Sequence, residues 1–174
     1  MDVFWDVLWD ELTSGLPNGR QLAHVIIRLI AATLLGAVVG IQRESVGKPA
    51  GLRTHMLVCL STAVFVVASS GVGMSSDGLS RVIQGIVTGI GFIGAGSILK
   101  LEKEHDIQGL TTAAGIWMTA AIGVAVGLGT LGIALLSTVM TLIILSLIGS
   151  LERRAEKALT AKTKDTNNWR KGGE

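Results

Sequence analysis

Charged residues are scarce in this sequence, and cysteine occurs only once. Charged side chains make up 16% of the 174 residues, whereas a soluble domain carries about 25%. Long stretches contain no charge and the charges gather between them, which is the pattern of a membrane protein. The single cysteine, Cys59, excludes an intrachain disulfide and a multi-cysteine metal site. We expect it to act as a small buried hydrophobic residue.

Signatures of common active sites are also missing. The sequence contains no HExxH, P-loop, GxSxG or CxxC motif, and no apolar run has a carboxylate near its middle. Magnesium prefers a nearly octahedral shell of oxygen ligands that usually includes one or two carboxylates. One chain therefore offers no evident metal site at the membrane midplane, and we expect no enzymatic activity, no cofactor and no nucleic-acid partner.

Five apolar runs separate the charged clusters. Hydrophobic residues make up 49% of the chain and the mean hydropathy is +0.57. Each run approaches the roughly 20 residues that span a bilayer at about 1.5 Å per residue. We predict an all-α, polytopic transmembrane bundle of about five helices, at residues 25–41, 54–70, 82–99, 110–128 and 130–150. Only Gly127-Leu128-Gly129 separates the last two, so one long bent helix is the alternative.

Lysine and arginine counts give the orientation of this bundle. With the amino terminus outside, the inner segments hold twelve of these residues and the outer segments two, Arg20 and Arg81. Cytoplasmic loops carry such an excess of positive charge. We predict an outer interfacial segment over residues 1–24, with Trp5 and Trp9 in the headgroup region. The bundle occupies residues 25–150, and residues 151–174 form a basic cytoplasmic tail.

An internal repeat with an offset of 58 residues relates two parts of the chain. Gly36-Ala37 precedes Gly51-Leu52-Arg53-Thr54, just as Gly94-Ala95 precedes Gly109-Leu110-Thr111-Thr112. Each unit is a helix, a loop and a returning helix, and parallel repeats of this kind can be related by an axis along the membrane normal. Chance agreement between glycine-rich segments is the alternative.

Glycines recur at spacings that favour close helix contact in lipid. We expect tight packing within one bundle, so that Gly89→Leu disrupts assembly. The alternative is a locally unwound segment that lines a path. The predicted packing residues are Gly36, Gly40, Gly85, Gly89, Gly91, Gly94, Gly96, Gly123 and Gly127.

Arg28 is the one full charge placed well inside an expected helix. Such a charge is costly in a membrane, so it either pairs with a partner or reaches the headgroups. Asp77, one turn before Arg81, is the expected partner. We expect Trp117 to be a core residue rather than a ligand-stacking residue.

The expected cytoplasmic starts of the second and fourth helices form a candidate anion site. Thr54 and either Thr111 or Thr112 are expected to cap these starts, and Arg53 adds a positive charge. Two positive helix ends beside an arginine favour a phosphate or carboxylate; two ordinary capped helix starts are the alternative. The candidate functional residues are Arg28, Arg43, Glu44, Arg53, Thr54, Asp77, Arg81, Gly109, Thr111, Thr112 and Trp117.

Several motifs together resemble the MgtC/SapB family. They are residues 36–44 (GAVVGIQRE), 48–54 (KPAGLRT), 89–96 (GIGFIGAG) and 109–114 (GLTTAA), with Asp77, Arg81, Trp117 and Gly123, in the expected order. The resemblance implies a bacterial inner-membrane protein with a small helical bundle, associated with adaptation to low magnesium and with virulence. The family's activity is open between magnesium transport and regulation of other membrane proteins.

Two features depart from the family pattern. Gln42 stands where many members have an acidic residue, which weakens any metal-ligand role there. Some members also carry a soluble carboxyl-terminal domain, and because this chain stops soon after its fifth expected helix, we expect no regulation through such a domain.

Two functions fit these observations. The first is a regulator that works through membrane-helix contacts with another membrane protein or a second copy of itself, within the lipid bilayer. The glycine faces and the lack of midplane carboxylates favour it. The alternative is an ion transporter or channel, whose path near the third expected helix is lined by Thr88, Ser97, Thr111 and Thr112.

The predicted orientation can be tested directly. A reporter fused after Glu174 is expected to report a cytoplasmic location, because the carboxyl-terminal segment holds seven of the twelve inner lysines and arginines. A periplasmic signal at that position would reverse the topology.

Overall fold

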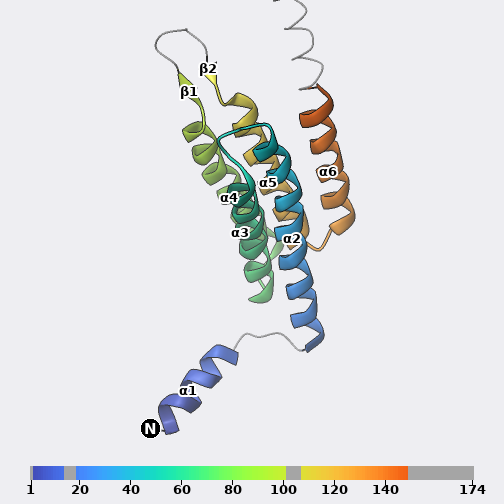
Figure 1. The fold of residues 1–174 in the computed structure, drawn as a ribbon. Helices are drawn as coiled ribbons and strands as arrows, with labels where there is room; N and C mark the ends of the chain where they lie inside the picture. The colour runs from blue at the N-terminus through green and yellow to red at the C-terminus, as the bar shows by residue number, and fades with distance from the viewer. Residues whose placement is uncertain (1, 14–18, 101–106, 149–174) are drawn as a thin grey trace, which may run out of the picture.

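The computed structural model describes residues 2–13, 19–100 and 107–148. They form a bundle in which successive helices run in opposite directions, with one helix apart from it near the amino terminus (Figure 1). The expected basic tail over residues 151–174 lies outside the described residues. The all-α fold class is confirmed.

The helices follow the predicted apolar runs with shifted ends. α1 (Asp2–Thr13) is the amino-terminal helix. Four helices are long and apolar enough to span a membrane: α2 (Gly19–Ser45), α3 (Leu52–Gly71), α4 (Ser76–Gly96) and α5 (Leu110–Gly127). α6 (Leu131–Ile143) is a shorter apolar helix and continues as a π-helical segment, η1 (Ile144–Ile148). Two short strands, β1 (Leu99–Lys100) and β2 (Ile107–Gln108), pair antiparallel between α4 and α5 and were not predicted.

A glycine-centred turn separates α5 from α6. Gly129 has a φ of 82°, and its N–H donates to the carbonyl of Val126 at 2.9 Å while that of Thr130 donates to Ala125 at 3.0 Å. This pair of hydrogen bonds is a Schellman motif, which ends a helix at a residue in the left-handed region. The alternative of one long bent helix is therefore wrong.

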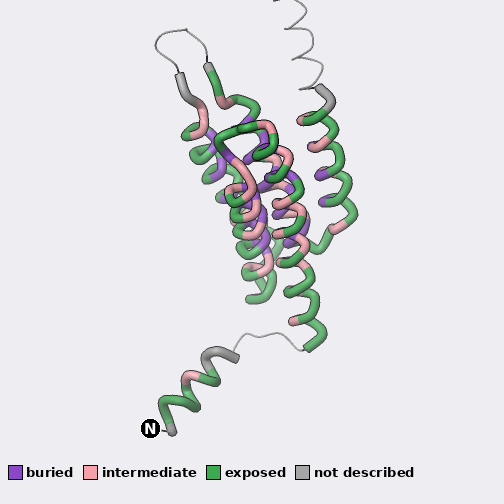
Figure 2. The backbone as a smooth tube through the Cα atoms, in the orientation of Figure 1, coloured by how far each residue is buried: buried purple, intermediate pink, exposed green. Residues whose placement is uncertain are grey.

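α3 and α5 lie at the centre of the bundle. α2 packs on both of them, α4 packs on both as well, and α6 packs on α5 and α2. The buried residues concentrate between these helices, and the outer faces are exposed (Figure 2). Large apolar side chains such as Leu57, Phe92 and Leu136 are exposed on those outer faces, where a bilayer would cover them.

Glycines of α2 and α5 allow these helices to approach α3 closely. A methyl group at Gly36 would lie 2.6 Å from the carbonyl oxygen of His55, and one at Gly40 would lie 2.7 Å from the Cα of Leu52. A methyl group at Gly127 would lie 2.7 Å from the Cβ of Val66. These distances are too short for any side chain, so the crossings require glycine.

The internal repeat reappears in the packing. α3 begins at Leu52 and α5 at Leu110, which are 58 residues apart. Gly36 faces His55 across the α2–α3 crossing, and at the same offset Gly94 faces Ala113 across the α4–α5 crossing. The second crossing is looser, because a methyl group at Gly94 would lie 3.6 Å from the Cβ of Ala113, an ordinary contact distance.

The other glycines of α4 do not pack within the bundle. A methyl group at Gly85, Gly89, Gly91 or Gly96 would meet no atom within 4 Å. The predicted tight packing of this stretch inside a single chain is therefore wrong for these four positions. They lie on the outer side of α4 or beside α3, and the close crossings are made by α2 and α5 instead.

Two glycine-to-alanine variants test this assignment. Gly123→Ala is expected to lower the free energy of unfolding by about 1–3 kcal/mol, because its methyl group would collide with the side chain of Thr62 and the carbonyl of Cys59. Gly85→Ala is the matched control in open space and is expected to be neutral. Thermal unfolding in detergent measures both, and equal melting temperatures for the two variants would refute the α3–α5 crossing.

Candidate functional site

The two predicted helix starts lie at one end of the bundle. α2 ends at Ser45 and α4 at Gly96 where α3 and α5 begin, beside the β1–β2 hairpin (Figure 1). We call this the hairpin end. α3 and α5 pack directly on each other, so their starts are neighbours.

The predicted side chains are only partly brought together at this end. Arg53 and Thr111 are exposed, Thr54 is half-buried, and Thr112 is buried with 2% of its surface exposed. The charge that points inward is instead Arg43, from the last turn of α2, which is also 2% exposed. Its Nη2 donates a hydrogen bond to the Thr112 hydroxyl at 3.2 Å.

Threonines do not cap either helix start. α3 has Gly51 at its N-cap without a side-chain bond, and the Glu44 carboxylate accepts a hydrogen bond from the Leu52 N–H at 2.9 Å. α5 has Gly109 at its N-cap, with a φ of 97° and no side-chain bond. The capping prediction is wrong because α3 begins two residues before Thr54, and α5 begins one residue before Thr111 and two before Thr112. The threonine hydroxyls are therefore inside the first turn rather than before it.

A buried histidine forms a second polar contact between α3 and α5. His55 is fully buried, and its Nδ1 lies 2.7 Å from the hydroxyl of Thr119. The Thr119 hydroxyl donates to the carbonyl of Gly115 at 2.8 Å. A hydroxyl has one proton, so when Thr119 donates to Gly115 its oxygen accepts from the Nδ1–H of His55.

Sequence reasoning missed His55, although a signal was present. It is an ionisable side chain within an apolar run, and in the structure it lies on α3 beside Gly36 of α2 and Thr119 of α5. Three buried polar atoms in this region have no hydrogen-bond partner: Oε1 of Gln42, Nε of Arg43 and Nε2 of His55. Buried polar atoms without partners are rare and often mark a site for a ligand, ion or water.

The opposite end of the bundle has a different charged contact. Arg28 donates through Nη1 to the carbonyl oxygen of Gly127 at 3.0 Å, in the last turn of α5. A cation at a helix carboxyl end is favourable. The expected Arg28–Asp77 pair is wrong: Arg28 bonds to Gly127 of α5, and α2 packs on α3, α5 and α6 without an extensive contact to α4. Asp77, in the first turn of α4, and Arg81 are both exposed.

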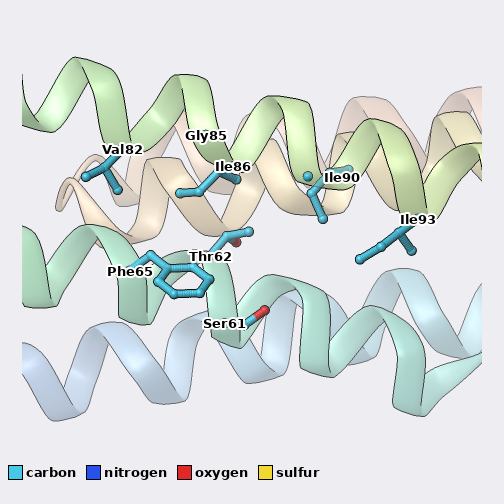
Figure 3. Close-up of a pocket in the computed structure, with 9 residues that line it drawn as sticks. Ser61, Thr62, Phe65, Val82, Gly85, Ile86, Ile90 and Ile93 are labelled. Carbon is cyan, nitrogen blue, oxygen red and sulfur yellow. The ribbon is translucent and has the colours of Figure 1, made fainter.

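An apolar groove of about 370 Å³ lies between α3 and α4. Figure 3 shows isoleucines and Val82 of α4 pointing towards Ser61, Thr62 and Phe65 of α3. Gly85 and Gly89 form part of its lining, where they leave open space instead of side chains. The groove is open to the side of the bundle and so faces the bilayer.

Trp117 is 48% exposed on α5 and borders a smaller hollow of about 130 Å³ between α4 and α5. Its expected place in the core is therefore wrong. Within residues 2–13, 19–100 and 107–148, no group of three or more histidine, cysteine, aspartate or glutamate side chains could hold a metal ion.

Comparison with known proteins gives a consistent set of relatives. Residues 29–154 match the MgtC family. The chain is 43% identical to SrpB of Synechococcus elongatus over 80% of its own length and 82% of that protein. It is 42% identical to YhiD of Escherichia coli K12, which is named as a candidate magnesium transporter, over 76% of this chain and 64% of YhiD.

Other relatives are longer than the matched region. Protein MgtC of Salmonella typhimurium is 44% identical over 67% of this chain, and the match spans 49% of that protein. The chain therefore spans about half the length of that relative. No solved structure matches the chain.

Proposed function

The chain belongs to the MgtC family, and from this we propose that it is a regulatory membrane protein. In this proposal it resides in the bacterial inner membrane, with its carboxyl terminus in the cytoplasm, and supports adaptation to low magnesium. It acts by contacting a transmembrane helix of another membrane protein, and it does not itself carry magnesium.

The groove between α3 and α4 is the observation that supports this proposal. The glycine pairs of α2 and α5 are used inside the bundle, whereas Gly85 and Gly89 of α4 have the same spacing and meet nothing. Small residues four apart allow two helix backbones to approach closely in lipid. The α4 pair therefore suits a helix from outside the chain.

The chemistry of the groove favours an apolar helix as that partner. Apart from Ser61 and Thr62, its lining consists of apolar side chains and glycines. The hydroxyls of both residues already donate to the carbonyl of Val58, at 3.2 and 2.9 Å. A partner helix thus needs a surface that is complementary in shape to the groove and carries small residues, and it needs no charge.

Magnesium transport is the second candidate function. The name of YhiD supports it, as do the polar side chains of His55, Thr112 and Thr119 buried between the helices. The buried charge at the hairpin end, however, is the guanidinium of Arg43. A positive charge repels a divalent cation, and this favours the regulatory function.

Two leucine substitutions test the groove. Gly89→Leu is expected to fold normally, because its Cβ would meet no atom of the chain within 4 Å and the open groove has room for the rest of the side chain. It is expected to fail to support growth at low magnesium, because the leucine fills the groove. Gly132→Leu, on the exposed side of α6 and equally free of contacts, is the matched control and is expected to support growth. Membrane abundance and thermal stability are measured for both, and wild-type growth with Gly89→Leu would remove the groove from the function.

A further inference from the structure

Arg43 is a buried charge with no counter-charge among the residues that the structure describes. It is 2% exposed, its Nη2 is bonded to the neutral Thr112 hydroxyl, and its Nε has no partner. The adjacent carboxylate, Glu44, is exposed and is directed at the Leu52 N–H instead. Across the described ranges no ion pair involves Arg43. An uncompensated buried charge is strongly unfavourable, so this one needs an anion.

The start of α5 beside Arg43 also has unpaired N–H groups among the described residues. The first three N–H groups of an α-helix have no acceptor within the helix. At the start of α3 the Glu44 carboxylate accepts from the first of these groups, the Leu52 N–H. At the start of α5 the Gly109 N-cap offers no side chain, and the N–H groups of Leu110, Thr111 and Thr112 have no acceptor in the described part of the chain.

These two positive features lie against each other. The guanidinium of Arg43 is 3.2 Å from the hydroxyl of Thr112, which is in the first turn of α5. The amino-terminal end of a helix carries a partial positive charge, so the arginine and the helix end repel each other. A bound anion would be attracted both to the guanidinium of Arg43 and to the amino-terminal end of α5, and would offset this repulsion. An oxyanion could accept from the free Nε of Arg43 and from the backbone of the first turn.

We propose that Arg43, Thr112 and the first turn of α5 bind a phosphate group. The fork of a guanidinium suits the oxygens of a phosphate. α3 has 20 residues, so at about 1.5 Å per residue it spans the hydrocarbon core, and the hairpin end reaches the level of the headgroups. The phosphate is either that of an anionic lipid headgroup or a soluble phosphate. This site is separate from the groove and does not depend on the proposed regulatory contact.

The experiment compares purified wild-type protein with two pairs of variants. Arg43→Gln and Thr112→Val remove the proposed contacts. Arg53→Gln and Thr111→Val are their exposed counterparts near the same helix starts. The melting temperature is measured in detergent with inorganic phosphate against chloride at equal ionic strength. It is measured again in phosphatidylcholine nanodiscs with and without phosphatidylglycerol.

The anion is expected to raise the melting temperature of the wild type, Arg53→Gln and Thr111→Val. It is expected to leave the melting temperature of Arg43→Gln unchanged. Thr112→Val keeps the arginine but loses the hydroxyl that orients it, so its apparent affinity falls about tenfold, as for the loss of one hydrogen bond to a charged group. A shift with inorganic phosphate indicates a soluble ligand, and a shift only with phosphatidylglycerol indicates a lipid headgroup.

Three results would overturn the proposal. The first is a wild-type protein that responds to neither anion, as expected if Glu102, the counterpart of Glu44 in the repeat, supplies the negative charge. The second is an Arg43→Gln variant that responds like the wild type. The third is loss of the response in Arg53→Gln instead. If Arg43→Gln does not fold, Thr112→Val against Thr111→Val still decides the outcome.

Discussion

The close approach of α2 and α5 to α3 determines the rest of this structure. Gly36, Gly40, Gly123 and Gly127 remove the side chains that would hold the helix backbones apart. In a bilayer the hydrophobic effect gives little driving force for helices to associate. Close van der Waals packing and interhelical hydrogen bonds therefore stabilise the bundle. α4 lacks such crossings, apart from the looser contact at Gly94. It leaves a groove beside α3 that the chain itself does not fill.

The same close packing explains how polar side chains are arranged inside the bundle. With little space for water, a buried donor or acceptor must find a partner on its own helix or on a neighbouring one. Hydrogen bonds join His55 of α3 to Thr119 of α5 and Arg43 of α2 to Thr112 of α5. At the opposite end of α5, Arg28 of α2 donates to the carbonyl of Gly127. At the hairpin end, Nε of Arg43 and Nε2 of His55 have no hydrogen-bond partner among the described residues. That end is therefore the part of the interior best suited to a ligand.

Hydropathy and the repeat predicted much of the fold. The long apolar runs became α2 to α5, and the 58-residue offset relates the first residues of α3 and α5. Which single residues pack against a neighbouring helix was harder to predict. Gly85/Gly89 and Gly123/Gly127 have the same spacing, and only the arrangement of neighbouring helices decides which pair is covered. Arg43 and Arg53 both lie at helix ends, but burial depends on which side of each helix faces α5.

Regulation and transport make opposite demands on the interior of this bundle. A regulator needs a surface such as the α3–α4 groove, whereas a magnesium transporter needs a path through a bundle whose buried charge, among the described residues, is the guanidinium of Arg43. Magnesium entry into liposomes that contain the purified protein and an enclosed magnesium-sensitive dye distinguishes them most directly. We predict that entry under an inward magnesium gradient is as slow as in protein-free liposomes. Saturable entry that increases with the amount of protein would contradict the regulatory function.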